Sequence, residues 1–371
     1  MVSPLYSSSR VMNSDISVPM ARAWLQNALN ALYHGADAAQ ATAMLRKVEA
    51  YLNAAASTNG PVSFDAPSRF SRMGFGVKTG RGSRHQAKPN EDNFFAICGT
   101  LPPTNLPFGF FVVTDGMGGH ANGQMASSIA IQQLTDIVLP RLLAGETQID
   151  SLLVEGIQSA HEAILQQNNQ QPEANAMGSL VTAALIIGAT ATIANVGDSR
   201  TYLYRPGMGL QQITEDHSVV ASMVEAGVIR PEDIYTHPKR NQVYRALGAI
   251  REPLVEVDLF TLTLEERDKL LLCSDGLWEM VRDPEIKCLL QANEEPAAIA
   301  HKLYEAALRG GGQDNIGVIV VEYALQSSNT EGLRTLDLRQ EQETAPLSSE
   351  NTRGGERSAT AYMPTVPRLW R

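Results

Sequence analysis

The chain has 371 residues, a formal net charge of −10 and a sequence pI near 5.3. Hydrophobic residues make up 43% and charged residues 19%, which is typical of a folded protein with a sizeable core and not of a disordered chain. The acidic balance argues against a general nucleic-acid or anionic-membrane binder, which would need a basic surface. The length allows two ordinary domains or one large domain with extensions.

The sequence carries no clear membrane, export or disulfide signal. No run approaches the roughly 18–20 apolar residues of a membrane span. Residues 1–22 lack the charged start and apolar block of a secretory signal. The three cysteines, Cys98, Cys273 and Cys288, are too few and too scattered for a disulfide framework or a zinc site. We therefore expect a reduced, cytoplasmic protein with no membrane or nucleic-acid partner.

The first predicted elements are helices within residues 1–68. Apolar residues from Trp24 to Leu32 recur at helical spacing, and Gly35 ends that pattern. A second helical pattern runs from Met44 to Leu52. The glycine and prolines of residues 60–67 are typical of a linker. This region therefore predicts a helical hairpin that precedes the main domain.

Residues 69–325 predict a single α+β domain. Apolar runs typical of buried strands are Phe108–Thr114, Ala183–Ile187, Leu270–Cys273 and Ile316–Val321. Helical patterns lie near 121–143, 149–169, 216–227 and 295–309. Because the helices come partly in pairs and not after every strand, the order favours a layered α+β architecture over a doubly wound parallel sheet. Residues 326–371 are polar and largely without periodicity, which predicts a disordered tail.

Acidic residues stand directly beside the strand-like runs. Asp115, Asp198 and Asp275 each follow such a run, Asp314 precedes one, and Glu91 and Asp92 precede Phe94–Ile97. One Asp-Gly pair is a common turn signal, but a repeated set indicates a shared site. Carboxylates that crowd together must take up protons or bind cations. Oxygen-only ligands favour Mg²⁺ or Mn²⁺ over zinc, and two such ions suit hydrolysis of a phosphate ester by activated water.

The order of these motifs resembles the metal-dependent Ser/Thr protein phosphatases of type 2C (the PPM family) in their bacterial form. The matching segments are Asn90–Asp92, Asp115–His120, Gly197–Arg200, Ser274–Gly276 and Gln313–Asn315, and Thr214–Gly248 resembles the flap of bacterial members. The resemblance covers about residues 70–323. It implies a four-layer α-β-β-α sandwich of two antiparallel sheets flanked by helices, here with an N-terminal helical extension.

The resemblance also implies the metal ligands. Asp115 would bridge two Mn²⁺ or Mg²⁺ ions, one of which would also take the carbonyl of Gly116. Asp275 and Asp314 would hold the other ion. Asp198, together with Asp275, would form a third, weaker metal site.

The implied reaction is hydrolysis of phosphoserine and phosphothreonine by direct attack of the metal-bridging water or hydroxide, without a phosphoenzyme. Glu91 and Asp92 would bind metal-bound waters or orient the attacking one, and with Asp115 they are the predicted catalytic residues. Phosphorylated proteins and a Ser/Thr kinase, whose action the enzyme would oppose, are the implied partners. A catalytically silent regulatory protein on the same fold is the alternative, and a non-protein phosphoester is another reading of the substrate.

The phosphate-binding arginine is where the sequence departs from the family. Members usually carry it four residues before the acid of the Asn-Glu-Asp motif, and that position is Ala87 here. We predict that Arg84 binds the substrate phosphate instead, with Arg81 and Lys88 as the alternatives. The histidine that follows Asp-Gly in eukaryotic members is Met117, so the sequence assigns no general acid.

Overall fold

The computed structural model describes residues 71–84, 89–101, 104, 106–118, 121–170, 176–248 and 253–325. The helical hairpin and linker predicted over 1–68 and the tail predicted over 326–371 lie outside these residues. No helix in the described ranges is both long enough and apolar enough to cross a lipid bilayer.

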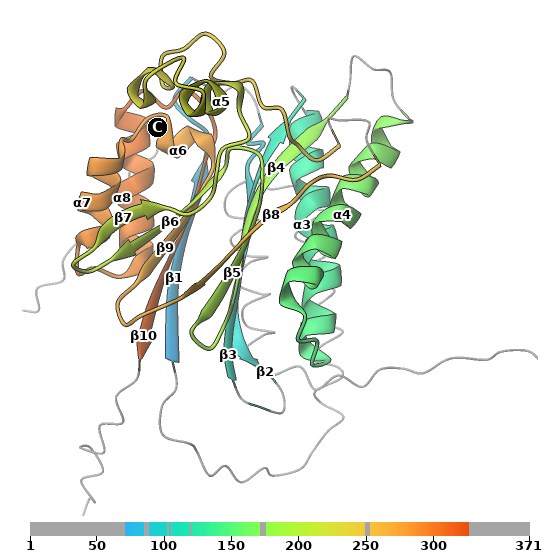
Figure 1. Ribbon diagram of the computed structural model, residues 1–371, viewed down its shortest axis with the longest axis vertical. Coiled ribbons are helices and arrows are strands. Elements are labelled where there is room, and N and C mark those ends of the chain that lie inside the picture. The colour runs from blue at the N-terminus through green and yellow to red at the C-terminus, as the bar shows by residue number, and fades with distance from the viewer. Residues whose placement is uncertain are drawn as a thin grey trace, which may run out of the picture. The chain divides into compact units, whose positions relative to one another are not determined.

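The described strands form two five-stranded sheets in which every neighbouring pair is antiparallel. One sheet contains, from edge to edge, β1 (Ser71–Gly80), β10 (Ile316–Leu325), β9 (Lys269–Cys273), β6 (Arg200–Arg205) and β7 (Gly209–Gln212). The other contains β2 (Asn93–Leu101), β3 (Leu106–Met117), β4 (Gly178–Ile187), β5 (Thr190–Val196) and β8 (Asp258–Thr263). Figure 1 shows the two sheets face to face.

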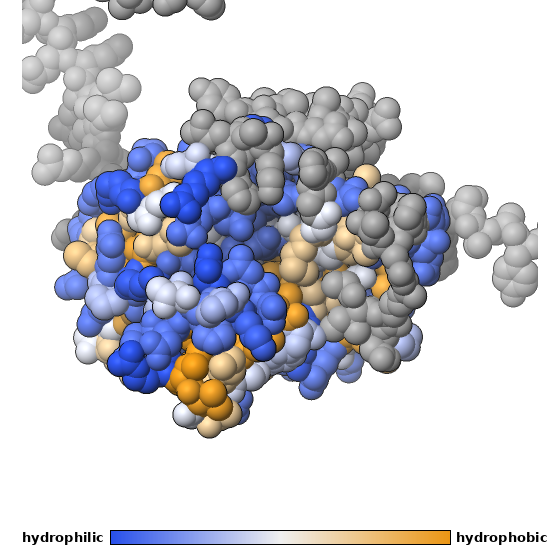
Figure 2. Space-filling model, turned by 90° about the horizontal axis from the view of Figure 1, so that it is seen from above, coloured by the Kyte–Doolittle hydropathy of each residue, from blue (hydrophilic) through white to orange (hydrophobic). Residues whose placement is uncertain are grey.

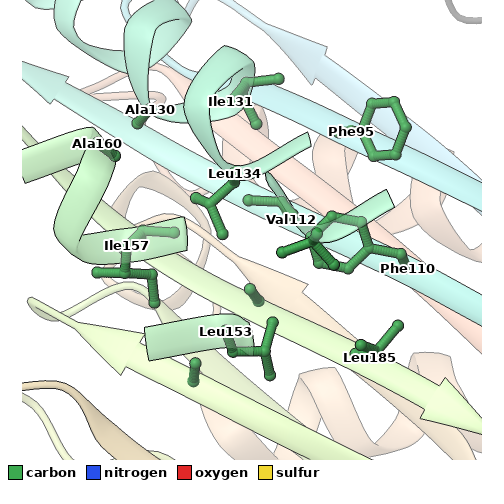
Figure 3. Close-up of a cluster of buried hydrophobic side chains, with 14 of the residues drawn as sticks. Phe95, Phe110, Val112, Ala130, Ile131, Leu134, Leu153, Ile157, Ala160 and Leu185 are labelled. Carbon is green, nitrogen blue, oxygen red and sulfur yellow. The ribbon is translucent and has the colours of Figure 1, made fainter. Parts of the chain in front are cut away.

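Helices cover the outer face of each sheet. The described helices are α3 (Ala121–Leu143), α4 (Ile149–Asn168), α5 (Val219–Glu225), the short 3₁₀ helix η2 (Pro231–Asp233), α6 (Asp275–Trp278), α7 (Asp283–Gln291) and α8 (Pro296–Arg309). α3 and α4 pack on the β3 sheet, where Ile131 and Leu134 belong to the same buried cluster as Phe110 (Figure 3). α6, α7 and α8 pack on the β10 sheet around the buried Trp278. The four layers confirm the predicted α-β-β-α architecture.

β3 shows why the central strands are unbroken apolar runs. Phe110 and Val112 belong to the cluster beneath α3 and α4, whereas Phe111 and Val113 belong to the cluster between the two sheets. Since successive residues of a strand point to opposite faces, a strand covered on both faces needs apolar side chains at every position. β8, at a sheet edge, alternates between half-buried and exposed residues instead.

The helices agree with the sequence patterns where those patterns are long. The patterns at 121–143, 149–169 and 295–309 correspond to α3, α4 and α8. The pattern at 216–227 was too long, because Ser218 caps α5 by accepting a hydrogen bond from the Ala221 amide. The short helices α6 and α7 were not predicted, because four and nine residues show too little periodicity to separate from turns.

Candidate active site

Antiparallel pairing gathers three acidic motifs at one end of the β3 sheet. The start of β2 lies opposite the end of β3, with Asn93 facing Thr114, so the Glu91–Asp92 pair lies near Asp115. The pairings of β3 with β4 and of β4 with β5 then carry Asp198, just after β5, to the same end. The expected convergence therefore follows from strand register alone.

The other sheet contributes the remaining two acids in the same way. The start of β10 lies opposite the end of β1, with Ile316 facing Gly80, and Val318 faces Cys273 at the end of β9. Asp314, just before β10, and Asp275, just after β9, therefore share one end of this sheet.

Hydrogen bonds between the sheets join the two sets of acids. The Ser274 hydroxyl donates to Asp92 Oδ2 over 2.6 Å, and it accepts from the Gly317 amide over 2.9 Å. The Glu91 amide donates to Asn315 Oδ1 over 2.8 Å. Because these bonds lie between the loops that carry the acids, they hold the two sets of loops together.

Glycines allow the loops of the site to touch. A Cβ on Gly276 would lie 1.8 Å from the Asn315 carbonyl oxygen, and a Cβ on Gly116 would lie 2.0 Å from the Gly123 carbonyl oxygen. Both contacts are far shorter than van der Waals separation, so only glycine permits this backbone approach. Gly116 and Gly276 therefore allow close contacts between backbones in addition to any turn that they form.

The electrostatics of the cluster favour neutralisation of its carboxylates. Burial raises the pKa of Asp92 to about 8, and the charge of Asp314 adds to this rise while the Ser274 hydrogen bond opposes it. Burial and the charges of neighbouring acids also raise the pKa of Asp115 and Asp275 well above the ordinary range. Such a cluster must hold protons or cations at neutral pH.

Asp198 is set apart from the other acids by a nearby cation. Burial raises the pKa of Asp198 to about 7, and the charges of Asp216 and Glu279 add to the rise, while the Arg200 guanidinium opposes it. One carboxylate oxygen of Asp198, Oδ1, is buried with no hydrogen-bond partner in the described structure. Since an unsatisfied buried oxygen is costly, a cation beside it would be stabilising.

The donor set fits oxygen-preferring divalent cations. No three His, Cys, Asp or Glu side chains of the described ranges form a group that could by itself hold one ion. Mg²⁺ does not require such a group, because it usually takes one or two carboxylates and completes its shell with water and phosphate oxygens. The carboxylate-rich donor set of this cluster is therefore compatible with Mg²⁺ or Mn²⁺.

The segment around Arg84 lies against the loop that carries Asp314. The Arg84 amide donates to the Gly312 carbonyl over 3.1 Å, and a Cβ on Gly82 would lie 2.1 Å from the Asp314 carbonyl oxygen. Arg84 and Arg81 are exposed. Residues 85–88, which include Ala87 and the alternative Lys88, lie outside the described ranges, so the phosphate-binding role of Arg84 stays a prediction.

The sequence did not reveal how Arg200 connects the site to the flap, the segment Thr214–Gly248. The buried Arg200 donates from Nε to Asp216 Oδ1 over 2.8 Å and from Nη2 to Asp216 Oδ2 over 2.5 Å. Its guanidinium lies 3.6 Å from the ring centre of Trp278, whose indole N–H donates to the Asp198 carbonyl over 2.9 Å. The Gly-Asp-Ser-Arg motif drew attention to Arg200, but its partners come from distant segments.

A second arginine, Arg240, reaches the site from within the flap. It pairs with Glu279 at 3.5 Å and donates to Gln313 Oε1 over 3.3 Å, next to Asp314. The sequence placed Arg240 in the segment that resembles the flap but did not predict its partners, because the flap has neither strand nor long helix to set its position.

The comparisons with known proteins agree with this geometry. The protein phosphatase 2C family matches residues 79–303, more than half of the chain. The chain belongs to the protein phosphatase 2C family. It is 39% identical over 213 residues to the serine/threonine phosphatase Stp of Listeria monocytogenes, which covers 57% of this chain and 83% of that protein. It is 41% identical over 239 residues to the serine/threonine protein phosphatase PstP of Mycobacterium tuberculosis, which covers 63% of this chain and 42% of that protein.

Solved structures of the family share the fold. The catalytic domain of PstP in complex with two manganese ions has a TM-score of 0.58 and 33% identity, and covers 68% of this chain and 99% of that chain. The phosphatase Stp1 from Staphylococcus aureus has a TM-score of 0.59 and 31% identity, and covers 70% of this chain and 99% of that chain. This protein phosphatase 2C member is therefore a phosphatase of a metal-dependent family, as the motif order predicted.

Proposed function

We propose that this phosphatase hydrolyses phosphoserine and phosphothreonine in proteins, in opposition to a Ser/Thr kinase in the cytoplasm. The observation that carries the proposal is the convergence of acids from both sheets at one end of the sandwich, supported by relatives named serine/threonine phosphatases. The three free cysteines are consistent with a reducing compartment. We propose that residues 69–325 form the catalytic domain.

The acids divide into ligands for two principal ions and one weaker site. If bound, the two principal ions would take ligands from Asp115, the Gly116 carbonyl, Asp275 and Asp314, with Asp115 contributing to both. Asp198 would serve the third site, next to the Asp275 loop. When bound, Mn²⁺ or Mg²⁺ would lower the pKa of water and offset the charge on the phosphoryl oxygens.

The other residues of the site position water and substrate. Glu91 and Asp92 would orient the attacking water, and the Ser274 hydroxyl holds Asp92 in one orientation for this task. Arg84 would bind the substrate phosphate through its guanidinium, which suits phosphate geometry. Burial raises the pKa of the Cys273 thiol well above its ordinary value, which keeps it protonated and unsuited to form a covalent phosphoenzyme. Direct attack by water, without a phosphoenzyme, is the route that we propose for these residues.

The test is phosphate release from a phosphothreonine peptide by the full chain with Mn²⁺, with Mg²⁺ and with a chelator. We expect hydrolysis with either metal ion and loss of activity with the chelator that is reversed when Mn²⁺ is added back. A labelled substrate quenched in acid should leave no label on the protein. Chelator-resistant activity would contradict the metal assignment, and labelled protein would contradict direct attack. Absence of any phosphatase activity would favour the catalytically silent alternative. The sequence itself does not point to that alternative, because a silent member would be expected to lack some of the core acids and none is missing here.

A further inference from the structure

A pocket formed largely by the flap includes Asp216 in its lining. It has a volume of about 460 Å³ and lies between the turn at Glu215 and Asp216, α5, the residues around η2, and Tyr244. Asp216 connects this pocket to the active site, because it binds Arg200, and Arg200 stacks on the Trp278 ring that is hydrogen-bonded to the Asp198 carbonyl. A substrate at the acid cluster could therefore place a neighbouring residue in the pocket.

The walls of the pocket combine apolar surface with unmatched negative charge. Val224 and Ile234 are half-buried, and Tyr244 is 48% exposed. Glu215 and Glu225 are exposed, and neither forms an ion pair with a residue in the described ranges. The charge of Asp216, by contrast, is already matched by Arg200. The face that carries α5 is mainly hydrophilic, with smaller hydrophobic patches (Figure 2).

We propose that this pocket binds the side chain of an arginine or lysine that flanks the phosphorylated residue of a protein substrate. The inference rests on the proposed function and names the substrates that the enzyme prefers. Long basic side chains bury their methylene stem on apolar surface and keep the charged head beside polar groups. A cation can also lie over a tyrosine ring such as that of Tyr244. An acidic side chain would be repelled by Glu215 and Glu225, and an apolar one would leave these carboxylates poorly hydrated.

The experiment compares pairs of phosphothreonine peptides that differ in one residue. Each pair carries either arginine or its neutral isostere citrulline, at one position within about five residues of the phosphothreonine, a reach of roughly 17 Å in extended chain. The quantity measured is the ratio of kcat/KM for the two peptides of a pair, determined in the same enzyme preparation. The ratio is unaffected if part of a variant preparation is unfolded.

We expect the wild-type enzyme to prefer arginine by about two- to fivefold at one or two positions, in line with the strength of partly exposed ion pairs. Glu225→Gln and Glu215→Gln should each bring the ratio closer to one. Glu232→Gln is the control, because it also removes one negative charge from the flap, where Glu232 pairs with Arg230 in and next to η2, but it does not line the pocket. It should leave the ratio at its wild-type value.

Two results would overturn the pocket assignment. One is equal hydrolysis of arginine and citrulline peptides at every position. The other is an equal loss of preference in Glu225→Gln and Glu232→Gln, which would assign the preference to the overall negative field. If p-nitrophenyl phosphate is hydrolysed but no phosphopeptide is, the proposed function fails and the pocket assignment fails with it.

Discussion

The acid cluster and the flap lie side by side but are built in opposite ways. The cluster consists of strand ends from two sheets, joined by hydrogen bonds such as that between Ser274 and Asp92. The flap, Thr214–Gly248, contains only α5 and η2 and has strongly exposed residues such as Val228, which is 66% exposed. Chemistry that requires fixed distances is thus placed on the rigid frame formed by the two sheets, and surface that can vary is placed on a loop.

The flap is nevertheless attached firmly at its base. The Ser218–Val243 bridge and the bond from the Tyr244 amide to the His217 carbonyl close it. The His217 ring accepts from the Gly197 amide over 2.9 Å, and its other nitrogen bonds to Asp258 over 3.0 Å. The contrast between frame and flap therefore concerns the body of the flap, and each prediction below tests one side of it.

The largest expected effect is on the frame, at Asp275. Asp275→Asn should lower kcat by more than about a hundredfold, since even changes to residues that only support metal ligands cost roughly 10–100-fold. Steady-state hydrolysis of p-nitrophenyl phosphate with Mn²⁺ measures this loss. Asp150→Asn, on the exposed surface of α4, makes the same chemical change and should keep wild-type activity. Equal activity of both variants would remove Asp275 from the metal site.

The next effect concerns the attachment of the flap to the frame through Arg200. Arg200→Gln should lower the free energy of unfolding by about 3–5 kcal/mol, because it leaves the buried Asp216 carboxylate without its partner. Arg200→Lys should recover part of this loss, since lysine keeps the charge but lacks the planar fork. Urea denaturation measures both values.

Amide hydrogen exchange separates attachment of the flap from general stability. Arg205→Gln is the matched control, because Arg205 forms a similar two-pronged contact with the buried Asp268. Exchange in the flap residues 219–242 should speed up more in Arg200→Gln than in Arg205→Gln. The same acceleration in both variants would show that Arg200 does not hold the flap specifically.

Much of the frame could be predicted from the sequence. Burial on both faces makes strands such as β3 visible as apolar runs, and Asp115, Asp198 and Asp275 then stand at their ends. Those acids indicate a cation site by their chemistry alone, and the order of the motifs pointed to the four-layer sandwich. The grouping of the acids was an expectation from these signals, and the strand pairings and the packing of the two sheets that produce it came from the structure.

The flap and its attachments could not be predicted, for physical reasons. The partner of Arg200 is Asp216, which lies beyond β6 and β7, and that pairing depends on how the sheet turns back on itself. Ser274 meets Asp92 only because two sheets pack face to face. α6 ends after one turn, too short for a periodic pattern. These contacts are set by tertiary packing, which local sequence patterns do not record.

A smaller effect tests how tightly the frame is packed at its glycines. Gly276→Ala should lower the free energy of unfolding by about 1–3 kcal/mol, because the new methyl group would meet the Asn315 carbonyl at 1.8 Å. Gly74→Ala is the control, since its nearest neighbour, Pro296 Cγ, would be 3.7 Å away. This control should be neutral or slightly stabilising, because alanine reduces the entropy of the unfolded chain. Equal stability of both variants would contradict the close approach at Asn315.

The smallest expected effect is a pH dependence at the base of the flap. Burial lowers the pKa of His217 below its ordinary value, and Asp258, Arg245 and Asp216 are the charged groups that face it. The unfolded chain therefore takes up the proton first as the pH falls. The contribution of His217 to the free energy of unfolding is therefore complete above about pH 6.5 and decreases below that value. Burial acts to raise the pKa of Asp258, but hydrogen bonds from His217 and Arg245 hold this pKa below its ordinary value. The contribution of Asp258 to the free energy of unfolding therefore decreases only at lower pH than that of His217.

The measurement compares the wild-type chain with His217→Asn by urea denaturation between about pH 7 and about pH 5.5. The acid cluster responds in the opposite direction, because carboxyl groups with a raised pKa bind more protons in the folded state and gain stability on acidification. This contribution is common to both proteins and cancels in their difference. The wild-type chain should therefore lose stability relative to the variant as the pH falls. A difference that stays constant with pH would show that His217 does not titrate in this window, and the flap base would then owe its closure to the backbone bonds around Val243 and Tyr244 alone.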